Sequence, residues 1–167
     1  MLKRPIIIGI DPGYDRLGWA VGQEQAGQWQ IMGQGCIQTN SKDDLTQRYQ
    51  QLIDELTAIL ERFHPQEAAI EQLFWSHNQT TAMAVSESRG LILTLFLQHG
   101  LLISQYTPSQ IKQAVTGYGR ADKKAVEKMV RLQLAISHKQ AKAINDDTFD
   151  ALALLICHQA ARKLNQL

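Results

Sequence analysis

IIIGIDPGYDRLGWAV, residues 6 to 21, decides the fold of this chain because it leads a strand through a charged residue into a turn. The β-branched apolar run predicts a buried strand that ends at Asp11, and Pro12 and Gly13 predict a turn directly after it. A carboxylate is unfavourable at the end of a buried strand, whereas it is useful in a metal or phosphate site. Asp11 is therefore the first candidate site residue, with an ordinary turn as the alternative interpretation.

The rest of the chain predicts a mixed α/β sheet with helices on its faces. Residues 17–23 and 29–39 have the pattern of two further strands in an antiparallel meander. Helical and extended segments then alternate, and a return to a parallel strand needs a crossover. We expect a helix over 43–63 capped by Ser41, a strand over 67–74, a helix over 79–98, a strand over 101–107, a helix over 108–117, a helix over 122–135 capped by Asp122, and a helix over 147–163.

The composition fits one globular domain over residues 1–167, since 44% of the residues are hydrophobic and 20% are charged. Cys36 and Cys157 lack C-x-x-C spacing, so we expect reduced thiols in a cytoplasmic protein rather than a disulfide or zinc framework. No stretch approaches the roughly 18 to 20 apolar residues that cross a bilayer. The N-terminus lacks a signal-peptide pattern, so we expect no membrane association and no export.

The charge is unevenly distributed although the net charge is only +1. Residues 43–71 hold seven acids against Arg48 and Arg62, whereas residues 109–142 hold two acids, Asp122 and Glu127. The eight basic residues of the second segment are Lys112, Arg120, Lys123, Lys124, Lys128, Arg131, Lys139 and Lys142. This distribution favours one basic face that meets a polyanion, and solvated helix faces are the alternative.

Four acidic residues lie at element ends that this topology can bring together. Asp11 ends the first strand, Glu71 interrupts the apolar run of the fourth, and Asp147 and Asp150 share one face of the last helix. If the first and fourth strands are parallel neighbours, Asp11 and Glu71 project from the sheet end where α/β proteins bind ligands. Each acid also has a structural interpretation, as a turn residue, an edge-strand charge, a helix cap or a partner of the helix dipole.

Clustered carboxylates repel one another, and a hard dication resolves this repulsion. Oxygen-only ligands favour Mg²⁺ or Mn²⁺ over zinc, because no His/Cys set with tetrahedral spacing is visible. Two such ions, roughly 3.5 to 4 Å apart, can activate a water molecule and stabilise the leaving oxygen of a phosphodiester. The acids therefore predict metal-dependent phosphodiester hydrolysis.

Four sequence blocks, in this order, resemble the signature blocks of the RuvC-type Holliday-junction resolvases over residues 6 to about 160. The blocks are IGIDPGYDRLGWAV, AIEQLFW, IKQAVTGYGRADKKAVEKMV and DDTFDALALLICH. The resemblance implies an RNase H-like fold with a five-stranded sheet. It also implies a homodimeric, magnesium-dependent endonuclease that nicks two opposed strands of a four-way DNA junction in recombination and repair. It leaves open whether a branch-migration complex such as RuvA and RuvB recruits the protein.

The resemblance also assigns roles to individual residues. Asp11, Glu71, Asp147 and Asp150 match the family's metal-binding acids, with two Mg²⁺ per site and Mn²⁺ as a substitute. The remaining implied site residues are Lys123 in catalysis and Lys112, Phe74, Trp75, Lys124 and Arg120 in DNA binding. Phosphate binding suits the cations, and stacking on unpaired bases suits the aromatic residues.

Two features depart from the family pattern. His77 lies where some relatives carry Arg, and Glu87 in the segment SESRG adds a negative charge, so the substrate-facing region can differ. The helices over 43–63 and 79–98 are both candidates for a dimer face.

Three alternative functions stay open. A YqgF-like nuclease would act on RNA, and the block GYGRADK disfavours it. An actin-like phosphotransferase would need a second phosphate loop and roughly twice this length. A non-catalytic junction-binding module would tolerate the loss of an acid, and all four acids are present.

Overall fold

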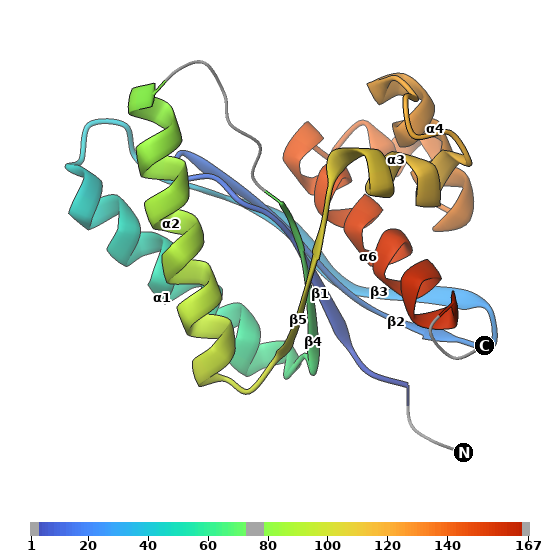
Figure 1. Ribbon diagram of the computed structural model, residues 1–167, viewed down its shortest axis with the longest axis horizontal. Coiled ribbons are helices and arrows are strands. Elements are labelled where there is room, and N and C mark those ends of the chain that lie inside the picture. Colours follow the sequence, from blue (N-terminus) through green and yellow to red (C-terminus); the bar gives the residue numbers. More distant parts are fainter. Residues whose placement is uncertain (1–3, 73–78, 165–167) are drawn as a thin grey trace.

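A computed structural model describes residues 4–72 and 79–164, which form one five-stranded sheet with helices on both faces (Figure 1). The strands are β1 Ile7–Asp11, β2 Arg16–Gln25, β3 Gln28–Gln38, β4 Glu67–Glu71 and β5 Leu102–Tyr106. The helices are α1 Leu45–Phe63, α2 Gln79–Gln98, α3 Pro108–Thr116, α4 Lys123–Gln133, α5 His138–Ala141 and α6 Asp146–Leu164. Within the described ranges, none of the helices has the length and apolar character to cross a bilayer.

The sheet has the order β3-β2-β1-β4-β5, with β1 in the centre. The first three strands form the expected antiparallel meander, and β4 lies parallel to both β1 and β5. Helices α1 and α2 cover one face, and α6 with α3 and α4 covers the other (Figure 1). This arrangement confirms the mixed α/β sheet with helices on both faces that the sequence predicts.

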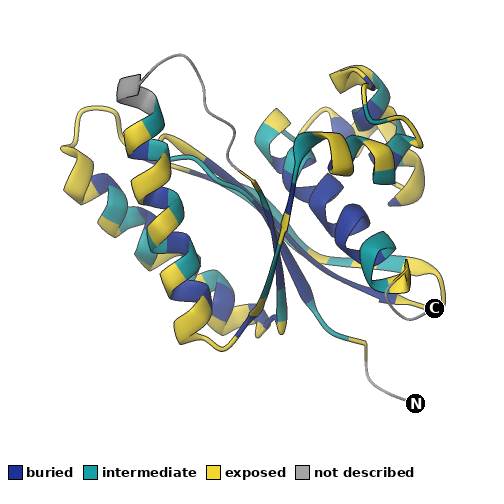
Figure 2. Cartoon of the chain, in the orientation of Figure 1, coloured by how far each residue is buried: buried dark blue, intermediate teal, exposed yellow. Residues whose placement is uncertain are grey.

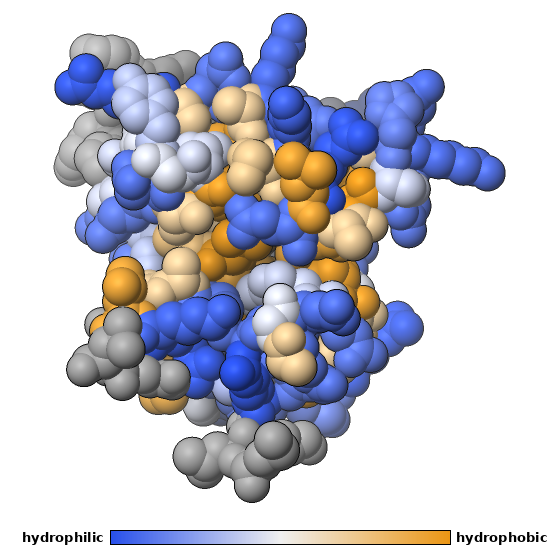
Figure 3. Space-filling view, turned by 90° about the vertical axis from the view of Figure 1, so that its right-hand side faces the viewer, coloured by the Kyte–Doolittle hydropathy of each residue, from blue (hydrophilic) through white to orange (hydrophobic). Residues whose placement is uncertain are grey.

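The central strand is buried on both faces, which explains its unbroken apolar run. Ile8 and Ile10 belong to the core beneath α1 and α2, while Ile7 belongs to the core beneath α6. Buried residues concentrate in the sheet and along α6 (Figure 2). On the side toward α4 and the end of α6, a hydrophobic band separates two hydrophilic regions of the surface (Figure 3). Since side chains alternate along a strand, Asp11 faces α6 as Ile7 does.

The helix ends partly agree with the sequence prediction: α2 spans 79–98 and α3 begins at Pro108, as expected, whereas one cap and some other ends differ. Asp122 caps α4 as expected, because its side chain accepts a hydrogen bond from the Ala125 amide. The expected cap of α1, Ser41, is wrong: Asp44 is the N-cap and forms a capping box with Gln47. The capping box is preferred to a cap at Ser41 because it satisfies two backbone N–H groups, that of Asp44 and that of Gln47.

The last two helices also differ from the prediction. Helix α6 begins at Asp146, one residue earlier than expected, and Asn145 accepts a hydrogen bond of 2.9 Å from the Thr148 amide. Asp147 is therefore not needed as the cap of this helix. Helix α5 was not predicted, because its four residues are too few to show a helical repeat.

Two glycines let α6 lie close against the sheet. A Cβ atom added at Gly9 would come within 2.4 Å of the Ala151 carbonyl oxygen, and one added at Gly18 within 2.0 Å of the Asp147 carbonyl oxygen. Both distances are well inside van der Waals contact, and the obstructing atoms are helix backbone that cannot rotate away. The first two turns of α6 therefore rest on β1 and β2 only because these positions carry no side chain.

Replacing Gly18 with Ala should lower the unfolding free energy by about 1–3 kcal/mol, because the helix backbone must move away from the sheet. Urea unfolding at fixed pH measures this change. Gly90→Ala is the matched control: Gly90 is exposed within α2, and an added Cβ there meets nothing within 4 Å. This control should be more stable by about 0.5–1 kcal/mol, since Ala favours a helix interior. Equal losses in both variants would contradict the close approach.

Candidate active site

The four acids that the sequence singled out gather at one end of the sheet. Asp11 ends β1 and Glu71 ends β4, and these parallel strands pair up to Ile10 and Ile70. The first turns of α6 lie across the same end, because Gly18 pairs with Asp11 and leaves room for the Asp147 backbone. The ends of β1 and β4 and the start of α6 thus meet at one end of the sheet, as the sequence predicted.

The Asp11 carboxyl shows how closely these charges approach one another. Burial raises its pKa to about 8, and the negative charges of Asp150 and Glu71 add to that rise. Asp147 acts in the same direction with a smaller effect, and the Lys123 ammonium opposes it. Without a bound cation, Asp11 is therefore largely protonated at neutral pH.

The neighbouring acids are perturbed in the same way. Burial raises the pKa of Glu71, the charge of Asp150 raises it further, and Lys112 opposes the rise. Burial also raises the pKa of Asp150, and Lys123 opposes it. Partly buried carboxylates that raise one another's pKa are the oxygen donors that a hard divalent ion binds and neutralises.

Lys123 brings positive charge to the start of α6. Its Nζ lies 3.2 Å from an Asp146 carboxylate oxygen and 3.7 Å from one of Asp150. Burial lowers the pKa of Lys123, but the hydrogen bond to Asp146 and the charge of Asp150 outweigh burial and raise it overall. Asp146 was missed as a site residue, although the adjacent pair in DDTFD was a signal for it.

A pocket of about 250 Å³ opens beside Glu71 and Asp150. Its polar part combines these two carboxylates with Lys112 from α3 and Lys123 from α4, and the rest is apolar. The apolar lining residues are Pro108, Ile111, Val126, Ala153 and Leu154. The structure thus places Lys112 and Lys123, the two lysines to which the resemblance assigns roles, beside the acids, where their charge opposes the repulsion between the carboxylates and an anion.

Asp147 faces a different partner from the other three acids. The Nε atom of Arg16 donates to its Oδ2 at 2.5 Å, and the Cys36 sulfur lies 3.7 Å from the same oxygen. Among the residues that the structure describes, no three acidic, His or Cys side chains converge as a ready-made ligand set. Arg16, the first residue of β2, was missed in the sequence, where it is a single cation directly before the predicted second strand and carries no signal for Asp147.

The other predicted DNA-binding residues are only partly described. Phe74, Trp75 and His77 lie outside the described residues. Arg120 and Lys124 are exposed, just before α4 and in its first turn. Tyr118, which the sequence reasoning did not single out, has 60% of its surface exposed in the loop that holds Arg120.

Glu87 has a structural partner. The Tyr49 hydroxyl donates to its carboxylate at 2.7 Å, which ties α2 to α1. This contact places Glu87 in the packing of the two helices rather than among the acids at the end of the sheet.

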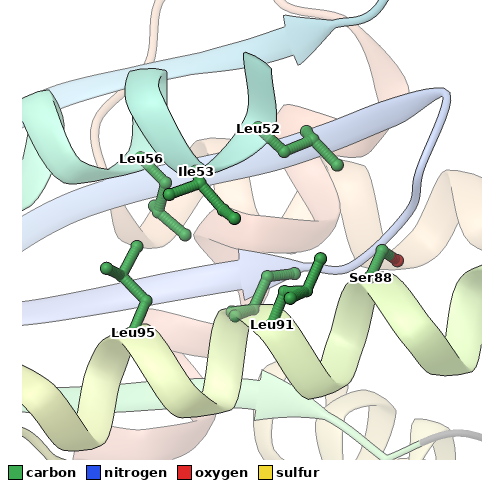
Figure 4. A pocket seen from close by; sticks show the side chains of 7 residues that line it. Leu52, Ile53, Leu56, Ser88, Leu91 and Leu95 are labelled. Atoms are coloured by element: carbon green, nitrogen blue, oxygen red, sulfur yellow. The ribbon is translucent and has the colours of Figure 1, made fainter. Parts of the chain in front are cut away.

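A second hollow, between α1 and α2, has no part in this chemistry. Leucine and isoleucine side chains from both helices face it, with Ser88 at one end (Figure 4). Its volume of about 10 Å³ is room for roughly one water molecule. It is a small packing gap on the sheet face opposite to the acids.

Comparison with known proteins gives one consistent result. Residues 7–158 match the sequence profile of the family "Crossover junction endodeoxyribonuclease RuvC". A protein of that name from Pseudothermotoga lettingae is 38% identical over 161 residues, covering 96% of this chain and 98% of the relative. The one from Roseiflexus sp. is 41% identical over 154 residues, covering 92% and 90%.

Solved structures agree with the sequence comparison. The structure "T. thermophilus RuvC in complex with Holliday junction substrate" superposes with a TM-score of 0.88 at 26% identity, covering 96% of each chain. The yeast mitochondrial Holliday junction resolvase Ydc2 shares the fold at a TM-score of 0.65 and 12% identity, covering 96% of this chain and 83% of its own. These matches confirm the RNase H-like fold expected from the sequence.

The raised pKa of Asp11 predicts a pH-dependent stability in EDTA. The unfolded chain releases this proton near the ordinary value of 3.8 and the folded chain near 8, so the folded state holds more protons between these values. Stability should therefore fall as pH rises through that range. Asp11→Asn removes the charge, and its stability advantage over wild type should grow to a few kcal/mol between pH 5 and pH 8.5.

Urea unfolding at the two pH values measures this advantage. Asp54→Asn, at an exposed position of α1, is the control and should differ from wild type by the same amount at both. An Asp11→Asn advantage that does not change with pH would contradict the raised pKa.

Proposed function

The chain belongs to the RuvC family of crossover junction endodeoxyribonucleases, and we propose that it resolves four-way DNA junctions by two symmetric, metal-dependent phosphodiester hydrolyses during recombination and repair. The observation that carries this proposal is the gathering of Asp11, Glu71, Asp147 and Asp150 at one end of the sheet, with lysines beside them. The related protein from T. thermophilus was solved with a Holliday junction substrate, which supports the same substrate here.

The four acids would hold the divalent ions on which this family of nucleases depends. Their donor atoms are all carboxylate oxygens, which fit Mg²⁺, and Mn²⁺ fits as a substitute. We propose two ions per site; when bound, such ions activate a water molecule and stabilise the leaving oxygen. Asp11, which burial keeps protonated without a cation, would release its proton as it becomes a ligand.

The lysines would admit the phosphate to this acidic site. Lys112 and Lys123 line the pocket beside Glu71 and Asp150, so an entering phosphodiester meets two ammonium groups as well as carboxylates. Lys123, 3.7 Å from Asp150, is placed to stabilise charge that develops at the cleaved bond. This is the catalytic role that we assign to Lys123.

The DNA surface would extend from this pocket along α3 and α4. Arg120 and Lys124 are exposed there and would bind backbone phosphates. We assign base stacking near the junction centre to Phe74 and Trp75 on the family resemblance alone.

The assembly that we propose is a homodimer of single nuclease domains spanning residues 1–167, acting in the cytoplasm. Two nicks on opposed strands need two active sites, and a two-fold symmetric dimer matches a junction with two-fold symmetry. Recruitment by a RuvA–RuvB branch-migration complex belongs to the same proposal.

Cleavage of a mobile four-way DNA junction tests this function. Purified protein with end-labelled junction should produce paired nicks on opposite strands in Mg²⁺ and none in EDTA. Asp147→Asn should slow cleavage at least about a hundredfold, because it removes one of the four proposed ligands. Asp54→Asn, on the exposed face of α1, is the matched control and should cut at the wild-type rate.

Linear duplex and an RNA hairpin distinguish the alternatives. Cleavage of the RNA alone would show a YqgF-like nuclease, and binding of the junction without cleavage in any divalent ion would show a non-catalytic module. Either result would overturn the proposed function.

Lys112 should contribute to junction affinity through phosphate contact. In Ca²⁺ without cleavage, Lys112→Gln should weaken junction binding and reduce the slope of log K against log salt by about one. Arg62→Gln is the control, since Arg62 is exposed in the last turn of α1, near the opposite end of the parallel strands. Fluorescence anisotropy at several salt concentrations measures both variants, and an unchanged slope for Lys112→Gln would argue against the contact.

A further inference from the structure

The position of Asp147 gives its carboxylate two possible neighbours. Gly18 of β2 pairs with Asp11 of β1 on one side and with Cys36 of β3 on the other. A Cβ added at Gly18 would lie 3.0 Å from the Cβ of Asp147, so this side chain starts directly above Gly18. From there the carboxylate can turn toward Asp11 and the other acids, or toward Cys36 at the far side of β2.

In the structure the carboxylate is turned toward β3. Arg16 donates to Oδ2 at 2.5 Å, and the Cys36 sulfur lies 3.7 Å from the same atom. This orientation keeps the carboxylate of Asp147 with Arg16 and Cys36, apart from the other acids, and no three acidic, His or Cys side chains of the described residues form a ready-made ligand set. One of the four proposed ligands is held by a cation of the protein itself.

We propose that Arg16 is a positioning residue that holds Asp147 on the β3 side of the site in the metal-free protein and releases it to a divalent ion. The proposal rests on the proposed function, since it requires the four acids to bind metal. The Arg16 guanidinium acts as a built-in counter-ion. A divalent ion must displace it before Asp147 can join Asp11.

We call the Arg16–Asp147 ion pair the latch, because it would form in the metal-free protein and break when a divalent ion binds. The physical chemistry of this contact allows it to form and break reversibly. A residue in a helix has two common χ1 rotamers, so Asp147 can change sides by one rotation while the backbone of α6 stays fixed on Gly18. The Arg16 and Asp147 side chains are 44% and 27% exposed. Ion pairs this exposed to water are weak, so a divalent ion that gains several carboxylate ligands outcompetes a single guanidinium.

The latch also lowers the apparent metal affinity of the wild-type protein. A ligand that binds only the released state has its affinity reduced by the fraction of molecules in that state. Removing the guanidinium makes the released state dominant and leaves the site more negative. Both effects have the same sign, so loss of Arg16 should tighten metal binding, whereas loss of a true ligand weakens it.

Mn²⁺ binding without DNA tests the proposal, with the free ion followed by electron paramagnetic resonance. Arg16→Gln should lower the Kd for Mn²⁺ by about threefold to tenfold. Lys42→Gln is the matched control, because it removes one positive charge from an exposed position in the turn after β3 at the same end of the sheet. Its Kd should stay within about twofold of wild type. An Arg16→Gln Kd equal to or higher than the wild-type value would overturn the proposal.

Asp11→Asn separates this inference from the proposed function. If Asp11→Asn weakens Mn²⁺ binding while Arg16→Gln does not tighten it, the acids bind metal and only the latch is wrong. If Asp11→Asn leaves Mn²⁺ binding unchanged, the metal site itself is wrong, and the latch with it.

Crystals of the wild-type protein grown without metal and soaked in Mn²⁺ supply a measurement that needs no variant. Asp147 should contact Arg16 without the ion and leave it when the ion binds. An Arg16–Asp147 contact that persists with metal bound to the other acids would overturn the latch.

Discussion

The close approach of α6 to the centre of the sheet is the constraint on which the rest of the structure depends. Gly9 and Gly18 give the helix backbone direct access to β1 and β2, and a side chain at either position would collide with a carbonyl of α6. The core beneath α6 forms from this contact, because the helix is buried along most of its length. The active site depends on it as well, because the same contact sets Asp147 above Gly18, beside Asp11.

A cost in electrostatic energy accompanies this arrangement. Bringing buried carboxylates together raises their pKa values, and in Asp11 the pKa reaches about 8. The protein limits the cost with its own cations, since Lys123 lies near Asp146 and Asp150 and Arg16 holds Asp147. These cations neutralise the clustered carboxylates only in part, so binding of a hard dication would stabilise the site further. Stability and function thus oppose each other at the end of the sheet that carries the acids.

Much of the fold could be predicted because its signals are local. The apolar run before Asp11, the helical repeats of α1 and α2, and the Asp122 cap all depend on residues within a few positions of one another. The failures have local causes too. The capping box of Asp44 and Gln47 outcompetes Ser41, and α5 is shorter than one period of a detectable pattern. Arg16 could not be found in this way, because its partner Asp147 is 131 residues away.

The sequence by itself determined the four acids, their places at element ends and the family, since these depend on residue type, order and spacing along the chain. Tertiary structure alone decided how the acids are used. The parallel pairing of β1 with β4 brings Asp11 and Glu71 to one end, and the packing of α6 on Gly18 gives Asp147 a choice between two sides. Strand pairing and helix packing bring together residues that are far apart along the chain. Contacts between such residues produce no periodic pattern in the sequence.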